Sequence, residues 1–99
     1  MNFKEQEQRL EIFRRDGWVC QNCGMRLSHP RAVPQIAHIL NQNKVNIKLY
    51  GKELIHHPLN LKSACGLLCN QKLSIYGKYG TIQKHVEKIQ KAIDDKVLL

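Results

Sequence analysis

Four cysteines stand in two close pairs along this chain of 99 residues. Two residues separate Cys20 from Cys23, and three separate Cys65 from Cys69. This spacing lets both thiolates of a pair turn toward one ion, and two pairs complete the tetrahedral set of four sulfur ligands typical of structural Zn²⁺. Four thiolates fill the coordination shell and leave no open position for catalysis. The alternatives are unrelated buried thiols or disulfides, and disulfides would need an oxidising compartment.

Histidines and asparagines suited to catalysis lie between and beside the two cysteine pairs. His38 falls in a short apolar segment, His56 and His57 precede Asn60, and Asn70 directly follows the fourth cysteine. A histidine, with an ordinary pKa of about 6.5, can take a proton from water at neutral pH. Taken singly, these residues also have structural explanations: a hydrogen-bonded strand histidine, a turn asparagine and a helix N-cap.

The positive charge of the chain is concentrated in its middle. The whole chain has a net charge of +8, and residues 18–80 alone carry eight basic residues against one acid, Glu53, a net charge of +7. This distribution favours a polyanionic partner, most simply nucleic acid. A basic surface without a partner is the alternative, and a membrane surface is disfavoured because the basic residues do not line an amphipathic helix. The lysines that we expect to contact nucleic acid are Lys44, Lys48, Lys62 and Lys72.

The length of the chain predicts one small domain with a modest core, of the kind that a bound metal often stabilises. No run of apolar residues is long enough to span a membrane, and the opening residues, MNFKEQEQRL, lack the apolar region of a secretory signal. We therefore expect a cytoplasmic, reducing location.

The middle of the chain predicts two short strands and a helix. Apolar and polar residues alternate over 35–40, which is typical of a strand with His38 on one face. We expect a polar connection over 41–58, a second strand over 59–64 and a short helix over about 68–75.

Helices are expected at both ends of the chain. Residues 3–15 have apolar residues at helical spacing, and residues 81–96 form an amphipathic helix. Its apolar stripe either packs on the core or forms a homodimer interface; its members are Ile82, Val86, Ile89 and Ile93. The single domain thus divides into an N-terminal helix (1–17), a cysteine-bracketed core (18–77) and a C-terminal helix (78–99).

The order of these motifs over residues 9–72 resembles the HNH endonuclease family. Members combine a strand that carries a histidine, a second strand that opens with asparagine, and a helix with histidine or asparagine near its start. Two cysteine pairs on a structural zinc often bracket this core. The resemblance implies an α+β fold of the small ββα-metal, or His-Me finger, type.

The resemblance also implies a role for each matching residue. His38 would be the general base, Asn60 would fix the loop between the strands and orient His38, and Asn70 would hold a divalent ion that stabilises the leaving group. The implied reaction is hydrolysis of DNA phosphodiester bonds, by nicking or by double-strand cleavage, to leave a 5′-phosphate and a 3′-hydroxyl. A phage, mobile-element or restriction setting is typical of the family.

Two departures from the family pattern bear on the ion. Many members have a metal-binding aspartate directly before the histidine, where this chain has Ala37, and the longer second cysteine pair moves Asn70 by one residue. A catalytic ion would then rely on His57 or, as second choice, His56, together with Asn70. Imidazole ligands suit Mn²⁺, Co²⁺ or Ni²⁺ better than Mg²⁺.

Two other functions remain open on the sequence. Ala37 is compatible with a zinc-stabilised module that binds nucleic acid and has lost catalysis, although such a module would not need His38. A ribonuclease of the same fold would show the same residues.

Overall fold

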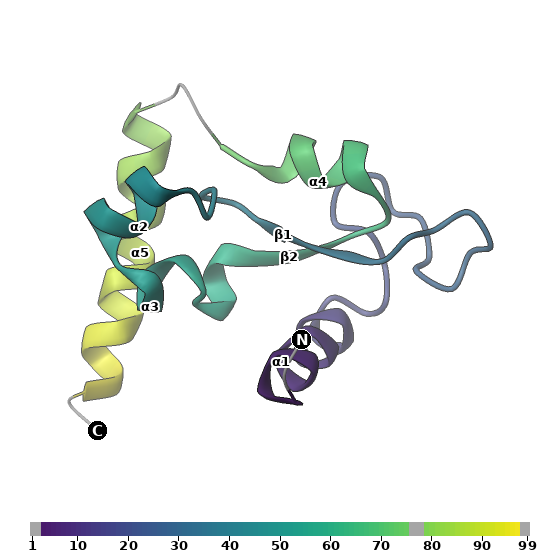
Figure 1. Cartoon of the computed structure of the whole chain (residues 1–99), viewed down its shortest axis with the longest axis horizontal. Helices are drawn as coiled ribbons and strands as arrows, with labels where there is room; N and C mark the ends of the chain where they lie inside the picture. The colour runs from purple at the N-terminus through teal and green to yellow at the C-terminus, as the bar shows by residue number, and fades with distance from the viewer. Residues whose placement is uncertain (1–2, 76–78, 98–99) are drawn as a thin grey trace.

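A two-stranded antiparallel sheet lies at the centre of the protein, whose computed structural model describes residues 3–75 and 79–97. Strand β1 (Gln35–His38) pairs with β2 (Leu61–Ala64), and His38 lies opposite Leu61 in the register. The sheet is flanked by helices along its length and at one end (Figure 1). This architecture is α+β, as the sequence predicts.

Two helices cover opposite faces of the sheet because side chains alternate along each strand. Helix α4 (Leu67–Leu73) packs on the face that carries the fully buried Ala37 and Ala64. Helix α1 (Phe3–Arg15) lies on the other face, where Ser63 Oγ donates a hydrogen bond to the main chain of α1. Figure 1 shows the strands running between these two helices. The expected helix over 3–15 is confirmed.

The end of α1 is fastened to the second strand by a pair of charged side chains. Arg15 Nη2 donates to the carbonyl oxygen of Leu61 at 2.6 Å, and Arg15 Nη1 donates to that of Pro58 at 2.8 Å. The neighbouring Asp16 carboxylate accepts from Arg15 Nε at 2.9 Å and from the N–H of Ser63 at 2.8 Å. Charge-assisted bonds to main-chain groups of this kind fix the position of α1 relative to β2.

The expectation of a polar connection over 41–58 was wrong. This segment contains helices α2 (Lys44–Tyr50) and α3 (Lys52–Ile55), followed by a single 3₁₀ turn, η1 (Pro58–Asn60), before β2. Asn43 begins α2, since its Oδ1 accepts from the N–H of Asn46 at 2.8 Å. Helices this short show too few turns for apolar periodicity to stand out in the sequence.

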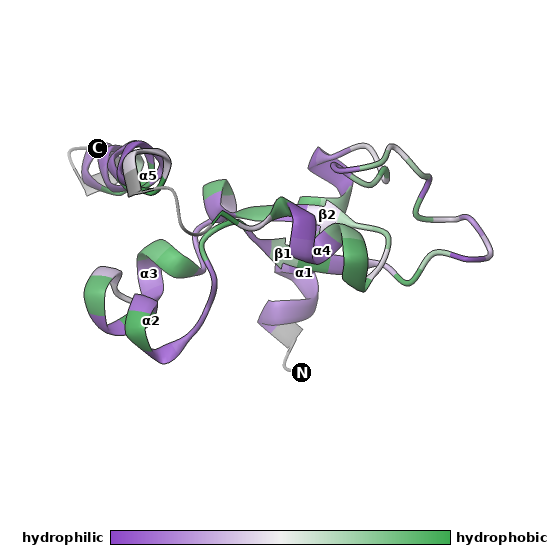
Figure 2. Cartoon of the chain, turned by 90° about the horizontal axis from the view of Figure 1, so that it is seen from above, coloured by the Kyte–Doolittle hydropathy of each residue, from purple (hydrophilic) through white to green (hydrophobic). Residues whose placement is uncertain are grey.

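A second core joins the C-terminal helix to the two short helices. Helix α5 (Tyr79–Val97) places Ile89, fully buried, against Leu54, Ile55 and Leu40, and the rest of its apolar stripe packs around them. Figure 2 shows α2, α3 and α5 grouped together beyond one end of the sheet. In this structure, the apolar stripe of α5 therefore packs on the core of its own chain.

The remaining element boundaries differ only slightly from expectation. The first strand ends at His38, the second begins at Leu61, and α4 ends at Leu73. The expected division between residues 77 and 78 lies outside the described residues. Within the described ranges, each helix is too short or too polar to cross a lipid bilayer.

Replacement of Ile89 by alanine tests whether the stripe packs within one chain. Because this side chain is fully buried, Ile89→Ala should lower the free energy of unfolding by about 2–4 kcal/mol. Urea denaturation measures this, with Lys91→Ala on the exposed side of α5 as the control. A midpoint that rises with protein concentration in the wild type would instead indicate that the stripe lies in a dimer interface.

Candidate metal centre and histidine site

The four cysteines converge at the end of the sheet, as their spacing predicts. Their Sγ atoms all lie within 4.8 Å of one another, and the Sγ atoms of Cys23 and Cys65 are 3.5 Å apart. All four are free thiols, so no disulfide competes with an ion. Among the described residues, the four cysteines are the one group of three or more histidines, cysteines or acidic residues close enough together to hold a metal ion.

Main-chain and amide N–H groups surround the sulfurs. The N–H of Asn22 points to Cys20 Sγ at 3.4 Å, and Asn22 Nδ2 points to Cys69 Sγ at 3.3 Å. Gly24, with φ of 81°, allows the tight turn in which its N–H reaches the carbonyl oxygen of Cys20. Such N–H donors stabilise thiolates and orient them as ligands.

Ionisation of the cysteines differs across the cluster. Burial raises the pKa of the Cys20 thiol, but the N–H groups of Cys23 and Asn22 outweigh it and lower this pKa to about 6. The hydrogen bond with Cys23, together with burial, raises the pKa of Cys65 to about 12. Four adjacent sulfurs therefore resist full ionisation by themselves, whereas a bound cation deprotonates its thiol ligands.

The cluster ties the loop after α1 to the strands and to α4. Cys20 packs against Ala37 and Ala64 in a small buried core, and the N–H of Gln21 donates to the carbonyl oxygen of Ser63 at 2.9 Å. Ala37 is fully buried there, on the face toward α4. An ion at the four sulfurs would cross-link segments that a two-stranded sheet alone holds weakly.

At the other end of β1, His38 contacts a second histidine. Its Nε2 lies 3.3 Å from Nδ1 of His56, and the two rings meet edge to face. Burial of the imidazole, together with repulsion from His56, lowers the pKa of His38 to about 4. His38 is therefore neutral at pH 7, the state that a general base needs.

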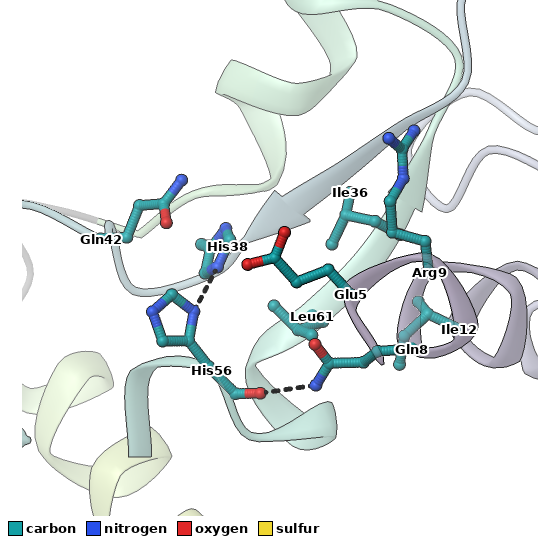
Figure 3. Close-up of a pocket in the computed structure, with 9 residues that line it drawn as sticks. All are labelled: Glu5, Gln8, Arg9, Ile12, Ile36, His38, Gln42, His56 and Leu61. Atoms are coloured by element: carbon teal, nitrogen blue, oxygen red, sulfur yellow. Dashed lines mark hydrogen bonds between the residues drawn. The ribbon is translucent and has the colours of Figure 1, made fainter. Parts of the chain in front are cut away.

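His38 and His56 line a cavity of about 280 Å³ beneath α1 (Figure 3). Glu5 and Arg9 of α1 line it too, and Figure 3 shows the Glu5 carboxylate directed toward the two imidazoles. Gln8 Nε2 donates to the carbonyl oxygen of His56 at 3.0 Å, which fastens α1 to the histidine pair. The helix thus brings a carboxylate to His38 that sequence spacing did not reveal.

Asn60 lies completely buried between the histidines and the C-terminal helix. Its Nδ2 donates to the carbonyl oxygens of Leu40, at 3.0 Å, and of Ile55, at 2.7 Å. Its Oδ1 accepts from the N–H of Leu40 at 2.8 Å and lies 2.9 Å from Nε2 of His85. Asn60 thus joins the segment after β1 to the end of α3 and to α5.

Asn70 and His57 have local partners of their own. Asn70 Nδ2 donates to Oε1 of Gln35 at 2.9 Å, while Asn70 and His38 both line a second cavity, of about 350 Å³. Nδ1 of His57 accepts from the N–H of Leu59 at 3.1 Å and so caps η1. The histidine brought to His38 is therefore His56, which the sequence ranks second.

The four lysines expected at a nucleic-acid interface are all exposed. In the described part of the chain, none of them takes part in an ion pair; they are Lys44, Lys48, Lys62 and Lys72. Lys62 pairs with Ala37 in the register, one residue from His38. Their charge is thus available to a polyanion.

Comparison of the chain with protein-family models, with curated proteins and with solved structures finds no match. Function is therefore inferred from the residues and geometry described above. Two of the contributing residues, Glu5 and His85, give no local sequence signal, because their partners at the site lie far away along the chain.

Loss of one cysteine tests the metal centre. Cys69→Ser should abolish stoichiometric metal binding and cooperative unfolding, because ion binding and folding are coupled in such sites. Elemental analysis and circular dichroism measure the two effects. Asn22→Ala removes one N–H donor and should keep the ion with an affinity about 10–100-fold weaker. An unchanged metal content in Cys69→Ser would show that the cluster does not bind the ion.

The pH dependence of the free energy of unfolding tests whether His38 is buried in its neutral state. A histidine whose pKa is about 6.5 in the unfolded chain and about 4 in the folded one contributes stability above pH 6.5 that is lost as the pH falls toward 4. In urea denaturation between pH 7 and 5.5, His38→Gln should therefore lose less stability than the wild type. His29→Gln, at an exposed position, is the control, and the metal centre is common to all three proteins. Equal losses in His38→Gln and the wild type would contradict the burial of a neutral imidazole.

Proposed function

We propose that this protein is a metal-dependent endonuclease of the HNH type that hydrolyses phosphodiester bonds in DNA. The observation that carries the proposal is the half-buried His38 at the end of β1, two residues before Leu40, whose main chain Asn60 binds, and beside a cavity that Asn70 also lines. Two antiparallel strands followed by a helix across one face, with four cysteines at their base, agree with a ββα core.

Zinc is the ion that we assign to the four cysteines. Tetrahedral Zn²⁺ with Zn–S bonds of about 2.3 Å places its sulfurs about 3.8 Å apart. Two measured Sγ–Sγ separations, 3.5 Å for Cys23 with Cys65 and 3.7 Å for Cys65 with Cys69, fit this requirement. With four sulfur ligands, the zinc has a structural role. The thiols must stay reduced to bind it, in keeping with a cytoplasmic location.

His38 is the residue that we assign as general base. In the tautomer whose Nε2–H donates to Nδ1 of His56, Nδ1 of His38 is the nitrogen that accepts the proton of the attacking water. The resulting hydroxide attacks phosphorus, and the bond from phosphorus to the 3′ oxygen breaks. Asn60 keeps the imidazole in place through the main chain on either side of the histidine pair.

The catalytic ion is assigned to the neighbourhood of Asn70. Asn70, through its Oδ1, and His57 are the residues that would bind it; Nδ2 of Asn70 donates to Gln35, and Nδ1 of His57 accepts from the N–H of Leu59. When bound, a divalent ion stabilises negative charge on the leaving oxygen. In the described part of the chain no second group of three histidines, cysteines or acids comes together, so phosphate oxygens of DNA must complete the shell.

A nucleic-acid-binding module without catalysis is the second candidate. Ala37 and the small number of protein ligands beside Asn70 favour it. Both functions would use the exposed lysines of the basic middle segment to bind phosphates.

Plasmid cleavage separates the two candidates. The wild-type protein should nick or cut supercoiled DNA with Mn²⁺, Co²⁺ or Ni²⁺ faster than with Mg²⁺, and His38→Ala should lower the rate about 10²–10⁴-fold because the general base is lost. Gel analysis measures the rates. His29 is exposed and is not among the residues that line the two cavities beside His38, so His29→Ala should cut like the wild type.

Other outcomes of this assay have definite meanings. DNA retardation without cleavage by either protein would favour the binding module, and cleavage of RNA in preference to DNA would make the protein a ribonuclease of the same class. Equal cutting by wild type and His38→Ala would exclude His38 as the base. A Mg²⁺ rate equal to that with Mn²⁺ would argue against imidazole ligation of the ion.

A further inference from the structure

The side-chain amide of Asn60 has its full set of hydrogen bonds. An asparagine amide offers two N–H donors and an oxygen with two lone pairs. Both donors of Asn60 point to main-chain carbonyl oxygens, of Leu40 and Ile55, which can only accept. The orientation of the amide is therefore settled, and its Oδ1 must be the acceptor for its two remaining neighbours, the N–H of Leu40 and Nε2 of His85.

This orientation also settles the state of His85. Since Oδ1 of Asn60 accepts, Nε2 of His85 must carry a hydrogen and donate it across 2.9 Å. His85 lies on α5, half-buried, 25 residues along the chain from Asn60. It is a polar link between α5 and the loop that connects the strands, in a contact region otherwise formed by apolar side chains such as Ile89 and Leu54.

The two main-chain segments held by Asn60 lead directly to the histidine pair. Leu40 follows His38 by two residues, and Ile55 directly precedes His56. Asn60 therefore sets the spacing of the segments whose side chains meet at 3.3 Å. A rotation of the Asn60 amide would break bonds to both segments at once, and the donor on α5 opposes that rotation.

We propose that His85 is a positioning residue of the site, which fixes the Asn60 amide from α5 and thereby holds His38 against His56. The catalytic part of this inference rests on the proposed endonuclease function, whereas the positioning part does not. Helix α5 then belongs to the working site, although none of its described side chains lines either of the two cavities beside His38.

Two variants of similar size and helix propensity isolate the hydrogen bond. His85→Gln keeps a side-chain N–H donor, and His85→Met fills a similar space without one. The zinc-loaded full-length chain is used throughout, with Lys84→Met at the neighbouring exposed position as the control. Amide hydrogen exchange at Leu40 and the ¹⁵N imidazole signals of His38 and His56 report positioning, and plasmid cleavage reports kcat and KM.

His85→Met should raise the exchange rate of the Leu40 amide about tenfold, shift both imidazole signals and lower kcat about tenfold with KM for DNA unchanged. His85→Gln should restore most of each value, and Lys84→Met should match the wild type. Unchanged exchange and imidazole signals in His85→Met, or equal defects in the Met and Gln variants, would overturn the proposal. If the wild type does not cleave DNA, the endonuclease function fails, and the exchange and imidazole measurements still decide the role of His85.

Discussion

Convergence of the four cysteine sulfurs is the constraint on which the rest of the structure depends. Two strands of four residues each cannot form a stable sheet by themselves. The small buried core beside the cysteines contains small side chains such as Ala37 and Ala64. The sulfur cluster joins the loop after α1 to the end of β2 and to α4, so one ion can replace the burial that this core lacks.

The second core lies at the other end of the sheet, since α3 and α5 gather beyond one end of the strands (Figure 1) and Cys65 follows the last residue of β2 at the opposite end. Leu54, Ile55 and Ile89 bring α3 and α5 together, and Leu40, from the segment after β1, packs with them. In the sequence, His38 lies between Ala37 of the small core beside the cysteines and Leu40 of the second core. The segment that carries it is therefore held at both ends, and the buried Asn60 binds the main chain of Leu40.

Sequence reasoning succeeded where the signal is local. The cysteine spacing, the apolar stripe of α5 and the helix over 3–15 are each visible in a short window and agree with the structure. Helices α2 and α3 were missed because they are too short for apolar periodicity to show. The sequence favours His57 as the histidine beside His38, whereas the structure places His56 there. His57 instead caps the η1 turn, so the two neighbouring side chains have different partners. Glu5 and His85 reach the site only through helix docking, which no local pattern encodes.

The burial of Ala37 restricts how this chain can evolve. Its methyl group lies within a core shared with Cys20 and Ala64, with Met25 and Leu73 packed around it. A carboxylate at this position would be desolvated beside sulfur ligands of negative charge, and both effects oppose its ionisation. A single mutation to aspartate would therefore be disfavoured before it could contribute to ion binding, unless neighbouring side chains had already changed.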